Sequence, residues 1–526
     1  MIPNSLSGEH SQDSEPNIAV NPENPAHMVA TAFTPAPLGG AFAPIYVSTD
    51  AGLTWSLRTV VPGNGTFGTG DITVGFATTG GVLYAGILHG TDGRLRLLRT
   101  ANFLSGTPMT TLVDRASEDQ PWVVAGSVVA AGSSRDRVFV GNNNFGQPAG
   151  GTATVDVSQD AATAGAPAGF APVQLEQRTT TGQDGPPIRV GLHPDGTVYT
   201  AHQRWVGGSF PNLTMDIVVT RDDNWGAGGF ADLSDAGDGQ AGVRVATGRF
   251  IRFNDQMGQE RLGGDLTICV DPTDSSTVVV AWCDRVGGVS GSDWTIHVRR
   301  STDRGITWSG DIRTVTNAKN PALAINSLGK LGFACQAFTG NRWVTSLEVT
   351  ADAWATAATT FVLHTAPSTA PNRTFLPYLG DYIRLITVGR DWYGVFSGNN
   401  TPDSANFPSG VTYQRNADWT SRTLLDTDNV TPVAISIDPF FFHHDDRFDL
   451  IQPIITRIPV TRTPIIRTPI LREPILREPI RREPIITREP IVTREPVITP
   501  SPIDPPPVVP GEADPSGGAD GPEFDL

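Results

Sequence analysis

The sequence has few cysteines and no long apolar run. Three cysteines in 526 residues are too few to cross-link a fold of this size. No stretch of about 18 apolar residues occurs, so we expect no insertion into a membrane. Residues 1–17 lack both a basic start and an apolar stretch, and we therefore expect no secretory signal there. The sequence therefore does not determine the cellular compartment, and a role outside the cell would need another route of export.

Positive charge is also scarce. The chain has 38 Lys and Arg against 54 Asp and Glu, which gives a formal net charge of −16. Nonspecific binding to a phosphate backbone depends on Lys and Arg that release counterions, so we expect no nucleic acid partner. Lys319 and Lys330 are the only lysines. Nearly all positive charge is therefore Arg, whose planar guanidinium suits the recognition of carboxylates.

Two of the three cysteines lie close together in the sequence. Cys269 and Cys283 flank a short turn and could face each other across a hairpin. Buried free thiols in neighbouring strands are the alternative. Composition alone does not decide between a disulfide and two thiols.

Turn-forming residues are abundant, and a repeat accompanies them. The chain has 56 glycines and 43 prolines, which favour many short turns over long helices. A unit of two apolar strands, a turn and two further strands recurs along residues 15 to 426. The clearest copy spans 265–285, with two β-branched strands, and 294–315, with two more. Four antiparallel strands of this kind make one blade of a β-propeller.

The unit openings predict the number of blades. They lie at residues 15, 71, 119, 184, 265, 320 and 381. The sequence therefore predicts an all-β fold, a propeller of seven four-stranded antiparallel blades. One propeller can extend over a chain of this length because each blade packs mainly on its neighbours. A ring of six blades with one irregular unit is the alternative.

Two octapeptides are the most specific motif in the chain. They are Ser48-Thr-Asp50-Ala-Gly52-Leu-Thr-Trp55 and Ser301-Thr-Asp303-Arg-Gly305-Ile-Thr-Trp308. Each predicts a turn between the third and fourth strands of a unit. Its Asp accepts backbone N–H bonds, its Gly permits positive φ, and its Trp buries its ring. Degenerate copies occur around Asp160, Asp222, Asp352 and Asp418.

These octapeptides resemble the Asp-box, or BNR-repeat, family of sialidase-like propellers, and the resemblance covers roughly the first 430 residues. In that family the box is mostly structural. Sialidases hold a substrate carboxylate with three arginines, the first in an Arg-Ile-Pro motif on the first blade, and add a Tyr nucleophile, a Glu and an acidic proton donor. Here no Arg precedes Arg58, and the only Arg-Ile-Pro begins at Arg457. The resemblance therefore implies the fold, but the first of the three arginines that hold the carboxylate is missing from the place where the family has it.

Some candidate catalytic residues lie near strand openings, where propeller sites gather. They are Arg189, Tyr378, Asp381, Tyr382 and Arg384. A Tyr or Arg in a strand is more often packed than catalytic, and fold alone does not assign function. We therefore lean away from an enzyme, with a sialidase-like glycoside hydrolase or lyase as the alternative.

The unit openings also share an acidic character. The residue before each expected first strand is a carboxylate in six units and an amide in the other: Glu15, Asp71, Asp119, Asp184, Asp265, Asn320 and Asp381. If the first strands are innermost, these side chains ring one mouth of the central channel and form a ligand-binding site. Closure of local turns is the alternative. Because clustered carboxylates repel one another, we expect Ca²⁺, a Lys or Arg side chain, or ordered water among them. We expect no required cofactor.

The composition changes after Pro439. We expect an N-terminal extension over 1–14, a propeller over 15–438, an extended Arg-Glu-Pro-Ile tail over 439–500 and an acidic, Pro/Gly-rich disordered end over 501–526. Prolines at a spacing of five or six residues keep the tail extended. It is expected to act as a stalk or as a docking segment for a larger assembly. A metal site at His443 to Asp446 is disfavoured, because neighbours in an extended chain point to opposite sides.

Together these features predict a recognition propeller that binds a glycan or a protein surface and joins an assembly through its tail. A glycan-cleaving enzyme is the rival. A purely structural subunit is the third reading.

Overall fold

The computed structural model describes residues 14–33, 42–62, 69–89, 94–130, 133–147, 150–161, 169–252, 265–288, 293–370, 379–426 and 428–446. The chain divides into two compact units, Met1–Ile451 and Gln452–Leu526. The second unit, with most of the expected tail and the whole of the expected acidic end, lies outside the described residues. Every regular element assigned within the described part is a strand.

Six consecutive sheets have four antiparallel strands in chain order. Blades one to three are β1 (Ser14–Val20), β2 (Met28–Phe33), β3 (Phe42–Ser48) and β4 (Ser56–Pro62); β5 (Thr69–Phe76), β6 (Leu83–His89), β7 (Arg94–Thr100) and β8 (Thr110–Ala116); and β9 (Glu118–Ala130), β10 (Ser133–Asn144), β11 (Ala153–Ser158) and β12 (Phe170–Gln174). Blades four to six are β13 (Arg189–Leu192), β14 (Val198–Ser209), β15 (Asn212–Asp222) and β16 (Val243–Arg252); β17 (Leu266–Asp271), β18 (Asp274–Val286), β19 (Asp293–Ser301) and β20 (Arg313–Thr316); and β21 (Ala318–Ile325), β22 (Leu331–Thr339), β23 (Arg342–Thr350) and β24 (Thr359–Pro367).

The seventh sheet departs from this pattern. It contains three described strands, in the order β25 (Arg384–Val388), β26 (Asp391–Asn399) and β29 (Ile437–His444), while β27 (Ala417–Asp418) and β28 (Thr423–Leu424) form a separate two-stranded ribbon. The prediction of seven blades is confirmed. β29 extends to His444, so the last blade continues past the boundary expected at Asp438.

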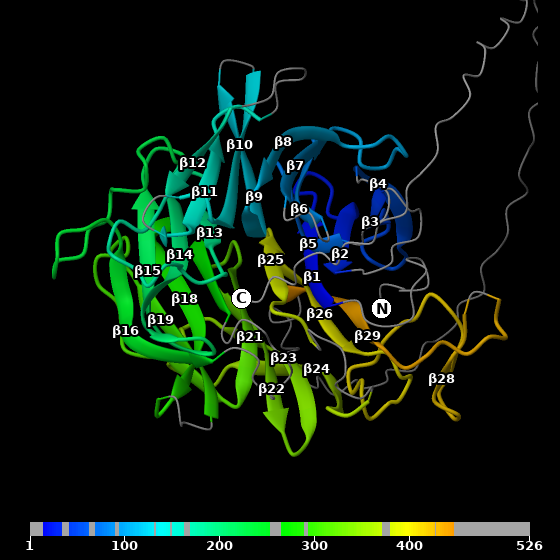
Figure 1. Ribbon diagram of the computed structural model, residues 1–526. Helices are drawn as coiled ribbons and strands as arrows, with labels where there is room; N and C mark the ends of the chain where they lie inside the picture. The colour runs from blue at the N-terminus through cyan, green and yellow to red at the C-terminus, as the bar shows by residue number, and fades with distance from the viewer. Residues whose placement is uncertain are drawn as a thin grey trace, which may run out of the picture. The chain divides into compact units, whose positions relative to one another are not determined.

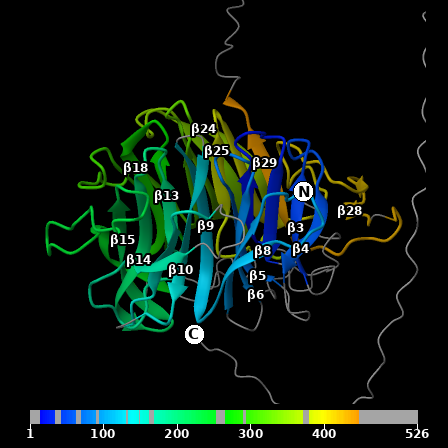
Figure 2. The same ribbon diagram turned by 90° about the horizontal axis from the view of Figure 1, so that it is seen from above.

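The first strand of each blade lies next to the propeller axis. Each first strand contacts the first strands of the neighbouring blades, from β1 through β5, β9, β13, β17 and β21 to β25 and back to β1. Figure 1 shows the blades arranged as a ring, and Figure 2 shows the same ring turned by 90°. Residues from all seven first strands enclose a channel of about 370 Å³. The assumption behind the acidic ring, that the first strands are innermost, therefore holds.

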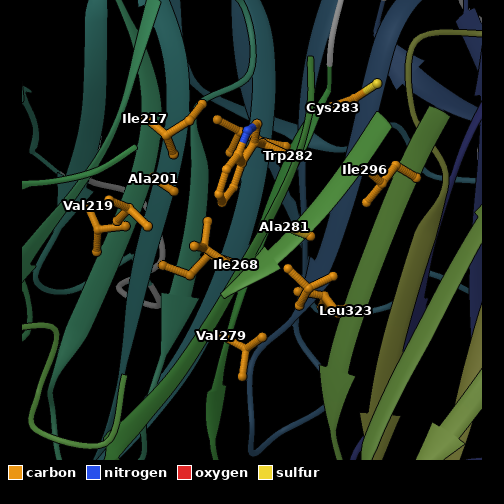
Figure 3. Packing of buried hydrophobic residues seen from close by; sticks show 14 of the residues in the cluster. Ala201, Ile217, Val219, Ile268, Val279, Ala281, Trp282, Cys283, Ile296 and Leu323 are labelled. Atoms are coloured by element: carbon orange, nitrogen blue, oxygen red, sulfur yellow. The ribbon is translucent and has the colours of Figure 1, made fainter. Parts of the chain in front are cut away.

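Apolar faces of adjacent blades pack against each other and form the core. Around blade five, Ile217 and Val219 of β15, Ile268 of β17, Ile296 of β19 and Leu323 of β21 belong to one buried cluster (Figure 3). β18 pairs with β17 along one edge and with β19 along the other. Its consecutive residues Ala281 and Trp282 point to opposite faces of the sheet and are both fully buried, so both faces are covered. Burying one such aliphatic side chain contributes about 1.5–3 kcal/mol. The burial of these strands explains why the β-branched residues of unit five form the clearest copy of the repeat in the sequence.

The two octapeptides form the same turn in blades one and five. Ser48 Oγ donates to Asp50 Oδ1 at 2.8 Å, and the Thr54 N–H donates to the same carboxylate oxygen at 2.8 Å. In blade five the corresponding distances are 2.7 Å from Ser301 Oγ to Asp303 Oδ1 and 2.9 Å from Thr307 N.

Glycine occupies the left-handed position of both turns. Gly52 has φ 85° and Gly305 has φ 82°, a region that L side chains rarely adopt. Trp55 is buried, and Trp308 is partly buried against the core of blade five.

The degenerate copies differ from the sequence frame in two blades. In blade four, Asp222 Oδ1 accepts from the N–H of Asn224 and Gly226, so Asp222 takes the role of the serine, and Asn224 stands at the position of the Asp. The frame assumed for this copy was shifted by two residues. In blade seven, Asp418 lies in the β27–β28 ribbon and not in a turn between third and fourth strands. The copy at Asp352 keeps the turn, since Asp352 Oδ2 accepts from Thr356 N at 3.1 Å.

All three cysteines are buried free thiols. Cys269 pairs across the β17–β18 ladder with Val279, and Cys283 pairs with Ile296 of β19. The register therefore keeps Cys269 and Cys283 apart and excludes the disulfide. Burial raises the pKa of the Cys335 thiol to about 12, so it stays protonated at neutral pH.

Candidate functional site

The ends of the first strands that carry the acidic residues meet around the axis. Six of the seven expected ring residues are buried: Glu15, Asp71, Asp184, Asp265, Asn320 and Asp381. Asp119 is only partly buried and accepts from the Gln120 N–H at 2.9 Å. Gln120 shares its positive φ with Glu15 and Asn320, and each of the three precedes a proline. The structural counterpart of Glu15 in blade three is therefore Gln120.

Arg189 begins β13 and faces β17 of the next blade. Its Nη2 donates to Asp265 Oδ1 at 2.8 Å, and both side chains are almost fully buried. Its Cζ lies 3.9 Å from the centroid of the Trp122 ring. A buried carboxylate needs a paired positive charge because burial removes its hydration. Arg189 supplies the positive side chain that the acidic ring was expected to require at Asp265.

Arg384 begins β25 and approaches the same indole. Its Cζ lies 4.3 Å from the Trp122 centroid. Burial and the like charge of Arg189 lower the pKa of the Arg384 guanidinium to about 9. Its Nη1 is buried and has no hydrogen-bond partner among the described residues, and the same is true of Arg189 Nη1. Two neighbouring guanidinium groups thus keep unused donors, and part of the Arg384 side chain remains accessible.

Tyr382 completes this group from blade seven. Its hydroxyl donates to Asp71 Oδ1 at 3.1 Å, and its ring meets Trp122 edge-on with centroids 5.4 Å apart. Burial, followed by the charges of Asp71 and Glu15, raises the pKa of Tyr382 well above 10. The phenol is therefore a hydrogen-bond donor and not a ready nucleophile. We call the whole group the channel cluster; its members are Asp71, Trp122, Arg189, Asp265, Tyr382 and Arg384.

The channel cluster stands at one end of an otherwise apolar channel. Trp122, Arg189 and Arg384 line the channel wall, and Phe76 is a further aromatic residue in it. The rest of the wall is mostly aliphatic, with side chains such as Val74 and Leu323. A ligand that enters this end meets two guanidinium groups and little else that is charged along the wall.

The structure brings together three of the five candidate catalytic residues. Arg189, Tyr382 and Arg384 share the channel cluster, and Asp381 is buried beside Tyr382 in sequence. Tyr378 lies outside the described residues. Trp122, which lies between these residues in space, was not predicted from the sequence. The available signal was its position directly after Gln120-Pro121, near the start of a first strand.

Two buried carboxyl groups have raised pKa values. Burial raises the pKa of Asp184 to about 7, although the charge of His202 opposes the rise. Burial also raises the pKa of Glu118 to about 8, and Arg115, which donates to Glu118, compensates only in part. Asp184 precedes β13 and is held by blade three, where its N–H donates to Thr152 Oγ1 at 3.2 Å. Groups that hold a proton near neutral pH are suited to acid–base work.

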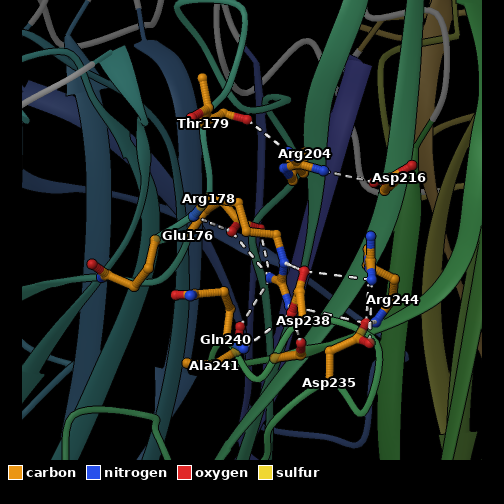
Figure 4. A network of polar contacts seen from close by, with 12 residues as sticks. Glu176, Arg178, Thr179, Arg204, Asp216, Asp235, Asp238, Gln240, Ala241 and Arg244 are labelled. Carbon is orange, nitrogen blue, oxygen red and sulfur yellow. Dashed lines mark hydrogen bonds and ion pairs between the residues drawn. The ribbon is translucent and has the colours of Figure 1, made fainter.

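A polar network joins the loop after β12 to the connection between β15 and β16 (Figure 4). Arg178 is its centre. It donates to Asp238 Oδ2 at 2.8 Å, to Glu176 Oε1 at 3.1 Å and to the Gly242 carbonyl at 2.7 Å. Arg244 donates to Asp235 Oδ2 at 2.8 Å and lowers the pKa of that carboxyl. The network fixes two long loops of blade four and leaves the Arg178 side chain only 5% exposed.

Within the described ranges, no group of three or more His, Cys, Asp and Glu side chains is arranged to hold a metal ion. Calcium binding at the acidic ring stays a prediction. His443 stacks on Tyr393 while His444 contacts Phe361, so the two neighbours point apart as expected. The described residues contain no helix that is long and apolar enough to cross a membrane.

No protein-family model and no curated protein matches the sequence. Several solved structures are similar. An α-L-arabinanase of Penicillium chrysogenum is 12% identical, with 74% of this chain and 89% of that chain covered and a TM-score of 0.36. An ulvan lyase of polysaccharide lyase family 25 is 9% identical, with 74% and 92% covered and a TM-score of 0.44.

The NanB sialidase of Streptococcus pneumoniae is 11% identical, with 75% and 67% covered and a TM-score of 0.32. At such values, function has to be argued from the side chains of this chain.

Proposed function

We propose that this protein is a recognition propeller that binds an acidic glycan at the channel cluster. The observation that carries the proposal is the pair of guanidinium groups on Trp122, each with a buried N–H donor that no described residue uses. A carboxylate or sulfate group of a sugar offers oxygens that accept such donors and offsets the repulsion between Arg189 and Arg384. Recognition is favoured over cleavage because Tyr382 is held as a neutral donor by burial and Asp71.

The two octapeptide turns support the wider assignment. Their repeated geometry between third and fourth strands agrees with membership of the Asp-box family, which we propose on that basis. In this proposal the turns stabilise the blades and take no part in binding. The expected tail, largely outside the described residues, is proposed to connect the propeller to a larger assembly.

Cleavage of a glycan is the second candidate. Asp184, with its pKa raised to about 7, is the observation that favours it, since a carboxyl group protonated near neutrality can serve as a general acid. It would require a nucleophile or an activated water as a partner.

The test is binding of acidic and neutral oligosaccharides to the full chain, first on a glycan array and then by calorimetry. Arg384→Gln removes the charge while keeping a polar side chain, and Arg135→Gln is the matched control because Arg135 is 62% exposed. We expect uronate, sialate or sulfated glycans to bind, with a loss of about tenfold or more in Arg384→Gln, as for a lost charge-assisted hydrogen bond. Unchanged binding in Arg384→Gln, or a preference for neutral glycans, would refute the proposal.

A further inference from the structure

The turn of blade six departs from the two octapeptides at two positions. Its hydrogen bonds are kept, since Thr350 Oγ1 donates to Asp352 Oδ1 at 3.0 Å and the Thr356 N–H donates to Asp352 Oδ2 at 3.1 Å. Trp354 takes the position of Gly, and its N–H donates to Thr350 Oγ1 at 3.0 Å. Ala357 follows Thr356 at the position where the octapeptides have Trp. A methyl group therefore replaces the indole at the end of this turn.

A cleft of about 540 Å³ lies beside this turn, between blades five and six. Its wall consists of residues 311–314 of blade five and of Glu348, residues 354–358 and Thr360 of blade six. Three of the residues in 354–358 are alanines, whose small side chains fill little of the space. Pockets for small ligands have volumes of roughly 300–1,000 Å³. We call this space the interblade cleft.

Arg313 and Glu348 link the two blades at the interblade cleft. Arg313 Nε donates to Glu348 Oε2 at 3.0 Å, and Arg313 Nη2 donates to Glu348 Oε1 at 2.5 Å. Trp354 Nε1 donates to the same carboxylate at 2.8 Å. These bonds fix a guanidinium, a carboxylate and an indole before a ligand arrives, which lowers the entropic cost of binding.

The charges in the wall of the interblade cleft are balanced. Glu348 is paired with Arg313, and Asp311, the other acidic residue of the wall, accepts from Arg299 Nε at 2.7 Å. An ion that entered the cleft would lose hydration without meeting an unpaired opposite charge among the described residues of the wall. The interblade cleft therefore favours a neutral ligand, whereas the channel cluster favours an anion.

Hydrogen-bonding capacity of both kinds remains at the cleft. A carboxylate accepts up to about four hydrogen bonds, and a guanidinium donates up to about five. Asp311 makes two with described residues, one with His297 Nδ1 and one with Arg299 Nε. Arg313 donates two to Glu348 and one to a backbone carbonyl. Hydroxyl groups both donate and accept, so they match this mixed set.

We propose that the interblade cleft binds a neutral pyranose sugar, with the partly exposed Trp354 ring against its C–H face and with Asp311 and Arg313 bonded to its hydroxyl groups. A pyranose combines an apolar face with polar edges, and an aromatic wall with a few fixed polar groups is complementary to both. This second site lies apart from the channel cluster and does not depend on the acidic glycan proposed there.

The backbone conformation at Trp354 supports a role for its ring. Its φ is 63°, and φ of Ala353 is 53°, a region that L residues rarely adopt. Residues in such conformations cluster at ligand sites. Here the conformation is held by the bond to Glu348, and it places the indole in the wall of the cleft.

Saturation-transfer NMR on the full chain tests the proposal, with maltotriose, cellotriose, mannotriose and xylotriose as neutral probes. Ala357→Trp restores the octapeptide residue and fills the cleft. Thr360→Trp fills it from an exposed position on β24 and decides the test if the first variant does not fold. Ile306→Trp is the matched control, because it adds a tryptophan to the blade-five turn at a residue that is 60% exposed and outside the cleft. Circular dichroism checks the fold of each variant.

We expect at least one neutral probe to bind, with a Kd at least about tenfold higher in Ala357→Trp and Thr360→Trp and unchanged in Ile306→Trp. Binding should also persist in Arg384→Gln and in high salt, because no ion pair with the ligand is involved. Binding of acidic glycans at the channel cluster should instead be lost in Arg384→Gln and kept in Ala357→Trp. Either site can therefore fail without the other.

Three results would overturn the proposal. The first is that no neutral probe binds the unchanged chain. The second is that binding survives in a cleft variant that is folded. The third is that binding is lost in Arg384→Gln or in Ile306→Trp, which would place the sugar outside the interblade cleft.

Discussion

Gly52 and Phe441 meet across the junction of the first and last blades. A Cβ on Gly52 would lie 2.2 Å from Phe441 Cε1, and the Phe441 ring also packs edge-on against Trp55 with centroids 5.5 Å apart. Gln414 strengthens the junction, since its Nε2 donates to the Trp55 carbonyl at 2.9 Å and its Oε1 accepts the Trp55 N–H. The octapeptide turn of blade one is thus part of the ring closure.

This junction predicts unequal effects of the same substitution in two equivalent turns. Gly305→Ala should cost about 1–2 kcal/mol, because φ 82° is unfavourable for an L residue and the nearest atom, in Leu233, is 3.1 Å away. Gly52→Ala carries the same backbone cost and adds a clash with Phe441 worth about 1–3 kcal/mol. Urea unfolding of the two variants measures the difference. Equal losses would show that Phe441 moves aside freely.

Trp354 stands at the left-handed position of the blade-six turn, where the other turns have Gly. Its φ is 63°, yet its Nε1 donates to Glu348 at 2.8 Å and its ring packs on Phe333. Trp354→Gly should therefore destabilise the fold, because the lost packing of a Trp, up to about 3–5 kcal/mol, exceeds the ~1–2 kcal/mol of backbone strain relieved. Thermal melting checks the sign, and a rise in melting temperature would contradict the argument.

The sequence predicted the architecture well because blade repeats carry strong local signals. Each signal reflects a structural requirement of a single blade: pairs of strands rich in β-branched residues, turns that contain Gly, and the octapeptides. The channel cluster was predicted only in part. Arg189, Tyr382 and Arg384 were chosen for lying near strand openings, but their meeting at Trp122 depends on the closure of the ring between blades three, four and seven.

Two other differences have local physical causes. The two-residue shift at Asp222 arose because an Asp side chain can accept the same N–H bonds as the serine oxygen. The residue type alone therefore did not show whether Asp222 takes the place of the Ser or of the Asp of the octapeptide. Residues 439–444 of β29 were assigned to the tail because the composition changes after Asp438-Pro439. Pro439 instead begins no turn and pairs with Ser397 inside the strand.

His364 predicts a loss of stability in acid. It is buried among Phe396, Phe407 and Phe440, and burial lowers its pKa to about 3. A histidine with a depressed folded pKa leaves stability intact above its unfolded pKa of about 6.5 and reduces it as pH falls below that value. The slope should approach about 1.4 kcal/mol per pH unit between pH 6 and 4. His364→Phe should flatten this slope in urea titrations, and an unchanged slope would exclude His364 as its source.

The last prediction concerns catalysis at the channel cluster. The full chain should release no fluorophore from a sialoside, while a sialidase assayed in parallel does. A retaining mechanism of the sialidase kind needs a tyrosine that becomes a nucleophile, and the pKa of Tyr382 is raised well above 10 by burial, Asp71 and Glu15. It also needs a complete arginine clamp, whereas one of the two described arginines at the channel, Arg189, is paired with Asp265.

Binding should persist where turnover is absent, so the same sialoside is also tested as a ligand of Arg384→Gln and of the unchanged protein. Turnover above the blank that disappears in Tyr382→Phe would establish an enzyme and reverse the preference for recognition. Turnover that survives Tyr382→Phe but fails in Asp184→Asn would place the chemistry at the second carboxyl site, because Asp184 holds its proton near pH 7.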